Sequence, residues 1–193
     1  MARKAVFCIR HGESTFNAAY QATGVDPLHR DAPLTEEGHR QVQAARAVVR
    51  DIAVELVVTS PLTRALQTTT GLFADHPARP AFLVEALHRE HGGSSCDIGR
   101  PPALLMAEFP HFTLDHLPDV WWHEEGEPDQ NGICYEPVER LQERVEAFRG
   151  WLRARPERTI AIVGHGTFFF HLTGQWLANC QVLPLDLDGP VQE

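Results

Sequence analysis

Short apolar runs recur along the chain, and each has the length of a β-strand. The runs at residues 4–9, 56–59 and 159–163 consist mainly of apolar side chains without polar alternation, which is typical of strands buried in a sheet. Residues 81–84 predict a further, less pronounced strand. A final run at residues 182–187 predicts an edge strand near the end of the chain.

Between these runs, apolar residues return every three or four positions, which predicts amphipathic helices. One helix begins after Thr35, because threonine is a favourable N-cap and two glutamates follow it. A second occupies residues 61–73, with Pro61 at the first helical position. Another follows a Gly-His-Gly turn at residues 168–178. The longest is predicted from the spacing of Val138, Leu141, Val145, Phe148 and Leu152.

Strands that alternate with helices predict an α/β fold, here a three-layer α/β/α sandwich around a mostly parallel central sheet. We expect residues 1–193 to form a single domain, since they contain no internal repeat or low-complexity segment. Residues 92–135 break the alternation and predict an insertion or lid, with one short helix near residues 102–109. Its aromatic residues fit a small satellite core or, less well, a lid that contacts substrate: Phe109, Phe112, Trp121 and Trp122.

The charge of the chain limits its partners. The 193 residues include 26 acidic and 17 basic side chains, giving a formal net charge of -9, and the basic ones form no stripe. This balance argues against nucleic acid and anionic membrane as partners. No apolar run is long enough to span a bilayer, and the first residues lack the apolar core of a signal peptide. Four widely separated cysteines favour a reducing, cytoplasmic location.

Polar clusters follow three of the predicted strands. Arg10-His11-Gly12 follows the first strand, Arg64 comes shortly after the second, and His165 follows the strand at residues 159–163. Because the carboxyl ends of parallel strands share one edge of a sheet, we expect two arginines and two histidines to meet in one cleft. Arginine matches the geometry of phosphate oxygens, and glycine allows close backbone approach. The cluster therefore predicts a site for a phosphoryl group.

A histidine in such a cleft can attack phosphorus directly and carry the phosphoryl group as a phosphohistidine. The attacking nitrogen must be unprotonated, and neighbouring arginines favour the neutral imidazole. Positioning and charge stabilisation then supply most of the catalysis, so no metal ion or other cofactor is required. An acid must protonate the leaving oxygen, and Glu90 lies in the right region. A surface salt bridge, for Glu90 or for the nearby Glu85, is the alternative.

Five segments resemble, in order, the motifs of the histidine phosphatase superfamily, whose fold is phosphoglycerate mutase-like. They read RHGESTFN, APLTEEGHRQ, TSPLTRALQT, LHRE and VGHGTF, and they extend from residue 10 to residue 168. The resemblance implies that His11 is the phosphorylated nucleophile and Glu90 the proton donor. It also implies that the phosphate pocket and the substrate-binding surface comprise Arg10, Ser14, Asn17, Thr23, Gly24, Arg64, His165 and Gly166.

The chain departs from the common family pattern after Glu90, where it reads HGGSSCDIGRPP. Cys96-Asp97 and Trp121-Trp122 resemble a branch of phosphatases with poorly assigned substrates, and we expect them to define the substrate side of the cleft. Extra basic residues for a phosphoglycerate carboxylate are missing. A metal-independent phosphomonoester hydrolase is therefore favoured over phosphoglycerate mutase-type transfer. A catalytically silent binding or scaffold member is a third alternative.

The sequence also leads to expectations about the ligand and the oligomeric state. The substrate is expected to be a small phosphorylated molecule, and free phosphate or sulfate would occupy the same site. A zinc site at His88, His91, Cys96 and His123 is a minor alternative, because these residues lack the usual ligand spacing. The edge strand at residues 182–187 could pair with a second copy of the chain, which would give a homodimer.

Overall fold

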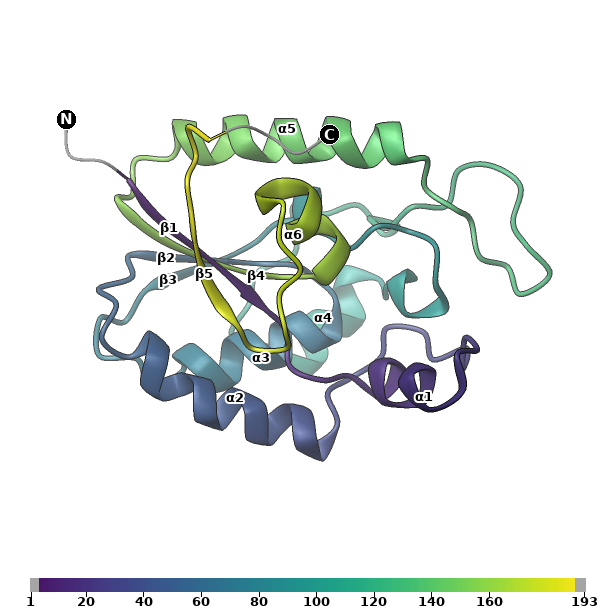
Figure 1. Ribbon diagram of the computed structural model, residues 1–193, viewed down its shortest axis with the longest axis horizontal. Helices are drawn as coiled ribbons and strands as arrows, with labels where there is room; N and C mark the ends of the chain where they lie inside the picture. The colour runs from purple at the N-terminus through teal and green to yellow at the C-terminus, as the bar shows by residue number, and fades with distance from the viewer. Residues whose placement is uncertain (1–3, 190–193) are drawn as a thin grey trace.

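The computed structural model describes residues 4–189, and within this range five strands form one sheet in the order β3-β2-β4-β1-β5 (Figure 1). The strands are β1 (Ala5–Arg10), β2 (Leu56–Thr59), β3 (Ala81–Val84), β4 (Thr159–Gly164) and β5 (Val182–Leu185). The first four are parallel, whereas β5 runs antiparallel to β1 at the edge. The predicted strands, including the edge strand, are confirmed.

Helices cover both faces of this sheet, which confirms the three-layer α/β/α sandwich (Figure 1). On one face lie α5 (Val138–Ala154) and α6 (Gly166–Thr173), and on the other lie α2 (Glu36–Val49) and α3 (Thr63–Phe73). Alternate strand residues serve the two layers: Ile160 and Ile162 pack against α5 and α6, whereas Ala161 and Val163 pack against α2 and α3. Burial on both faces explains why the strand sequences are continuously apolar.

The register of the parallel strands brings the predicted polar clusters to one edge. Arg10, at the end of β1, pairs with Gly164 at the end of β4. Thr59, at the end of β2, pairs with Val163, which also belongs to β4. The residues that follow these three strands therefore leave the sheet side by side. This alignment is the structural basis of the site.

Helix ends were predicted less accurately than helices. Thr35 caps α2 as expected, because its hydroxyl accepts the Gly38 N–H at 2.9 Å. The placement of Pro61 at the first position of α3 is wrong, since that helix begins at Thr63. Asp31 accounts for this start: its carboxylate accepts both the backbone N–H and the hydroxyl of Thr63. Helix α6 ends at residue 173, before a left-handed Gly174, and not at residue 178.

Helix α1 (Thr15–Thr23) was not predicted. It begins with a reciprocal capping box, in which the Ser14 hydroxyl accepts the Asn17 N–H while the Asn17 side chain accepts the Ser14 N–H. Phe16 is its buried residue, so the helix has almost no apolar periodicity to reveal it.

The insertion at residues 92–135 begins with η2 (Ser95–Asp97), shortly after η1 (Ala86–His88), and continues through α4 (Pro102–Glu108). Trp121 is buried with Leu105, Phe109 and Phe112, and these residues pack against α3. The indole N–H of Trp121 donates to the Arg100 carbonyl at 2.9 Å. Trp121 thus belongs to a satellite core and not to a lid. Among residues 4–189, no helix combines the length and apolar character needed to cross a bilayer.

Candidate active site

His11 lies in the tight turn that follows β1. Its backbone N–H donates to the Gly164 carbonyl at 3.0 Å, and its own carbonyl accepts the side chain of Asn179 at 2.9 Å. The next residue must be glycine, because a Cβ on Gly12 would lie 2.7 Å from the Gly38 carbonyl oxygen. Gly164, Asn179 and Gly38 thus contact the backbone of residues 11 and 12 from three separate segments, and these contacts fix the position of the imidazole.

The surroundings of His11 determine its protonation. Its Nδ1 lies 2.7 Å from the Gly12 carbonyl oxygen, which can only accept, so Nδ1 carries the proton and Nε2 keeps its lone pair. Burial lowers the pKa of His11 well below its usual value, and the positive charges of Arg64 and Arg10 lower it further. The imidazole is therefore neutral near pH 7, with Nε2 available as a nucleophile.

His165 lies beside His11 as expected, with ring centroids 5.2 Å apart. Its Nε2 is 2.7 Å from the Ser60 hydroxyl, and that hydroxyl also accepts the Leu62 N–H. The Ser60 hydroxyl can either donate to Nε2 or accept from it, and the other ring nitrogen of His165 is Nδ1. That Nδ1 is buried and has no partner, and the same is true of the Arg10 Nε. An oxyanion beside His11 would satisfy the Arg10 Nε–H, and it would satisfy His165 Nδ1 in the tautomer that protonates this nitrogen.

Arg64 is buried and holds three partners at once. Its Nε points to the Nε2 of His11 at 3.3 Å, and Nη1 donates to the Cys96 carbonyl at 2.6 Å. Its Nη2 forms an ion pair with Asp97 at 3.0 Å, with both side chains at most 6% exposed. Burial, with a smaller contribution from the charge of Glu90, raises the pKa of Asp97, Arg64 opposes this rise, and the resulting pKa is about 7. A carboxyl that titrates near neutrality therefore adjoins the expected phosphate position.

Glu90 lies at the N-terminus of α6. Its Oε2 accepts the Thr167 N–H at 3.1 Å, and its Oε1 accepts the N–H groups of Phe168 at 3.0 Å and His91 at 2.9 Å. Three backbone donors hold the carboxyl group in one orientation, while Oε2 keeps lone-pair capacity for a proton. Glu90 also borders the same cavity as His11, as a proton donor to a leaving group would have to.

The cavity at this edge has a volume of about 260 Å³. Five of the predicted residues line it: Arg10, His11, Asn17, Arg64 and Glu90. His165 is fully buried beside His11 and is not among the lining residues, and Gly166 packs against Arg10, where an added Cβ would lie 3.4 Å from Nε. Ser14 is buried as the cap of α1. Thr23 and Gly24 lie at the far end of α1 and do not line this cavity, so their roles remain predictions.

Several lining residues were not anticipated. Phe16, His91, Ser94 and Tyr135 also border the cavity, and Tyr135 packs edge-on against the His91 ring. They come from α1, from the residue just before the insertion and from the two ends of the insertion, where no periodic pattern exists to indicate their direction. Asp97 was expected on the substrate side of the cleft, and it does line the cavity. Its ion pair with Arg64 links positions 33 residues apart and has no signal in the sequence.

A neutral imidazole with arginines around it, at the carboxyl edge of a mostly parallel sheet, is typical of α/β enzymes that act on phosphoryl groups. Comparison with known families agrees. The model of the histidine phosphatase superfamily (branch 1) matches residues 6–185, and the chain belongs to that family.

Two relatives agree with this membership, and a solved structure has the same fold. The chain is 29% identical to the phosphoglycerate mutase-like protein 1 of Arabidopsis thaliana, over 92% of this chain and 73% of that one. It is 27% identical to glucosyl-3-phosphoglycerate phosphatase of Mycolicibacterium vanbaalenii, over 92% and 74%. A solved structure of a putative alpha-ribazole-5'-P phosphatase from Escherichia coli has the same fold, with a TM-score of 0.60 at 23% identity over 88% and 77%. The family and these relatives comprise phosphatases and mutases.

Proposed function

We propose that this protein is a metal-independent phosphomonoester hydrolase that acts through a phosphohistidine at His11 on a small phosphorylated substrate. The observation that carries the proposal is the state of His11: Nδ1 is committed to the Gly12 carbonyl, and Nε2 is unprotonated beside Arg64. Two buried nitrogens without a partner, Arg10 Nε and His165 Nδ1, support an oxyanion at the same place.

The reaction would proceed in two displacements. His11 Nε2 forms a bond to phosphorus while the ester P–O bond breaks, and the leaving oxygen takes a proton from Glu90. Water then attacks the phosphohistidine and loses a proton to the Glu90 carboxylate. The P–N bond breaks, which releases phosphate and restores the neutral imidazole. Arg10, Arg64 and His165 stabilise the charge on the oxygens during both steps, and no metal ion is needed for this purpose.

The charge of the cavity favours hydrolysis over a mutase reaction. Among its described lining residues, Arg10 and Arg64 are the guanidinium groups, and Glu90 and Asp97 are acidic. Asp97 already occupies one side of Arg64. A phosphoglycerate carboxylate would therefore meet acids and no spare arginine. A catalytically silent member is disfavoured, because residues suited to act as nucleophile, acid and phosphate ligands lie together at one edge of the sheet.

The proposal predicts phosphate release from simple monoesters without any added metal or primer. With phenyl phosphate and β-glycerol phosphate as probes, turnover should persist in excess EDTA and should need no bisphosphorylated activator. Release of inorganic phosphate is the measurement. Turnover that requires a bisphosphate primer, with the phosphoryl group retained in an isomerised product, would instead establish a mutase.

Asp97 predicts the pH dependence of anion binding. An oxyanion beside Arg64 repels the Asp97 carboxylate, so binding favours protonated Asp97, whose pKa is about 7 in the free protein. Above that pH, affinity should fall by up to about tenfold per unit, because binding must then be accompanied by uptake of a proton. Sulfate is the suitable probe, since its own charge is constant in this range, and His11 remains neutral throughout.

The measurement is the inhibition constant of sulfate between pH 6 and pH 9 in wild type and Asp97→Asn, a range chosen to bracket the Asp97 pKa of about 7. The asparagine keeps an oxygen that can accept from Arg64 but cannot ionise. Its profile should be flat, with the larger gain in affinity at high pH. A steep profile that persists in Asp97→Asn would assign the titration to another group.

A further inference from the structure

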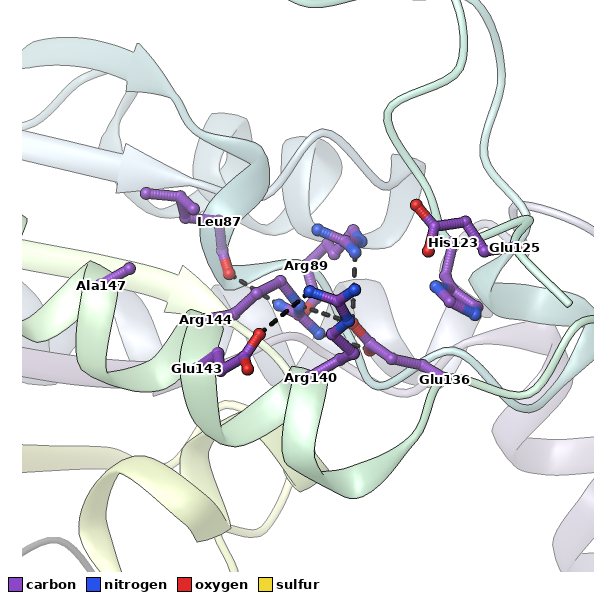
Figure 2. Close-up of a pocket in the computed structure, with 9 residues that line it drawn as sticks. All are labelled: Leu87, Arg89, His123, Glu125, Glu136, Arg140, Glu143, Arg144 and Ala147. Carbon is purple, nitrogen blue, oxygen red and sulfur yellow. Dashed lines mark hydrogen bonds and ion pairs between the residues drawn. The ribbon is translucent and has the colours of Figure 1, made fainter.

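A second cavity, of about 330 Å³, lies where the N-terminal half of α5 meets the segment that carries Glu90 (Figure 2). Its charges balance, with three arginines against three glutamates among the lining residues, so it offers no excess of charge to a ligand. Figure 2 shows instead that Arg89, Arg144 and Glu136 converge on one another in its wall. This buried ion cluster requires an explanation of its own.

Arg144 uses its whole guanidinium group. Its Nε and Nη2 donate to the two carboxylate oxygens of Glu136, each at 2.7 Å. Its Nη1 donates to the carbonyls of Leu87 at 2.6 Å and Arg89 at 3.1 Å, and Nη2 also reaches the Glu90 carbonyl at 3.4 Å. The backbone carbonyls of Leu87, Arg89 and Glu90 thus all accept hydrogen bonds from this one side chain.

Glu136 holds the same segment from the other end. Its carboxylate accepts the backbone N–H of Gly92 at 3.2 Å, and its own backbone N–H donates to the Gly92 carbonyl at 2.8 Å. Arg89 adds a second guanidinium contact to this carboxylate, at 3.2 Å. Together, Glu136 and Arg144 therefore bind the backbone on both sides of Glu90.

The segment between η1 and η2 has neither helix nor strand to organise it. Backbone groups in such a segment need other partners when they are buried, and here Arg144 and Glu136 supply them. Buried ion pairs of this kind seldom stabilise a fold more than apolar residues of similar size would. Their position beside Glu90 suggests that they define geometry and not merely stability.

We propose that Arg144 and Glu136 are positioning residues for the proton donor, fixing the Glu90 backbone so that its carboxyl group reaches the leaving oxygen. This inference rests on the proposed function, in which Glu90 protonates that oxygen. Neither side chain lines the cavity of His11, so any effect on chemistry is indirect. It reaches Glu90 through the segment at residues 87–92 and through Phe168, whose ring lies under the Arg144 guanidinium group and whose N–H donates to the Glu90 carboxylate.

The test compares two substrates whose need for a proton differs. Dinitrophenolate leaves unprotonated, whereas phenolate from phenyl phosphate benefits strongly from a proton donor. We expect Arg144→Lys and Glu136→Gln to lower kcat/KM for phenyl phosphate by about tenfold or more. For dinitrophenyl phosphate, the loss should stay within about threefold, because the His11 pocket is untouched. The ratio of the two rates does not depend on how much of a variant is folded.

Two comparisons make the result specific. Arg140→Gln is the matched control, because Arg140 lines the same cavity on the same helix but donates to the exposed Glu143. It should leave the substrate ratio unchanged. In a Glu90→Gln background, Arg144→Lys should change the phenyl phosphate rate little further, since both act on one step.

The outcomes distinguish failure of the positioning role of Arg144 and Glu136 from failure of the proton-donor role of Glu90. Equal losses on both substrates in Arg144→Lys and Glu136→Gln, while Glu90→Gln alters the ratio, would overturn the positioning role and leave the proposed function intact. An unaltered ratio in Glu90→Gln itself would overturn the assignment of the donor, and with it the inference. A selective loss on phenyl phosphate in all three variants supports both.

Discussion

Replacement of His11 with alanine is expected to reduce hydrolysis of any phosphomonoester by at least about 10³-fold, the scale on which loss of a catalytic nucleophile acts. The physical reason is specific to this site. The Nε2 lone pair is fixed by the bond from Nδ1 to Gly12 and kept unprotonated by burial and by two guanidinium groups. Alanine removes the nucleophile while Arg10, Arg64 and His165 remain to bind the anion.

Measurement of kcat and of phosphate affinity will distinguish this loss from unfolding. His11→Ala should retain binding of inorganic phosphate or sulfate, because its donors are intact. His39→Ala provides the control, since His39 is an exposed histidine on α2 and should leave kcat at the wild-type value. Substantial hydrolysis by His11→Ala would refute the assignment of the nucleophile.

The second large effect concerns Glu90. Glu90→Gln keeps the size of the side chain and one oxygen, which can accept either the Thr167 N–H now at Oε2 or the Phe168 N–H now at Oε1, but it cannot transfer a proton. General acid catalysis contributes about 10²- to 10⁴-fold, so a loss of this size is expected for phenyl phosphate. The loss should shrink as the leaving group becomes less basic, because the proton is then less necessary.

A plot of the rate against leaving-group basicity for a series of aryl phosphates measures this effect. It should be steeper for Glu90→Gln than for wild type. Glu85→Gln is the matched control: Glu85 caps η1 by accepting the Leu87 N–H at 2.9 Å and does not line the cavity. Parallel plots for wild type and Glu90→Gln would mean that another group supplies the proton.

The sheet was predictable from local signals in the sequence, and the centre of the site follows from the topology of that sheet. Strand β4 is a continuous apolar run, and a strand buried on both faces has no other pattern. The topology rule for parallel sheets then brings the residues after β1, β2 and β4 together, whatever the loops do. The meeting of His11 and His165 follows from that rule alone and is confirmed by their ring contact.

The contacts that hold the site together were not predictable, because they depend on side chains that meet across long separations. Asp31 starts α3 from a loop 32 residues earlier, and Asp97 reaches Arg64 from the insertion. Arg144 lies between Leu141 and Val145 on α5, where a charged residue is normally solvated. Arg144 can be buried because its guanidinium group donates hydrogen bonds to the Glu136 carboxylate and to the backbone carbonyls near Glu90. Periodicity indicates which face of a helix is buried, but it does not reveal a buried charge with distant partners.

Direct capture of the intermediate tests the central claim. Dinitrophenyl phosphate is mixed with an excess of enzyme, and the reaction is quenched in alkali during the first turnover. Peptide mass spectrometry then locates any phosphoryl group on the protein. The account predicts a phosphoryl group on His11 that survives base, is lost in acid, and appears before free phosphate. Dinitrophenolate and phosphate released together with no phosphorylated protein at any time, or a phosphoryl group on a different residue, would contradict it.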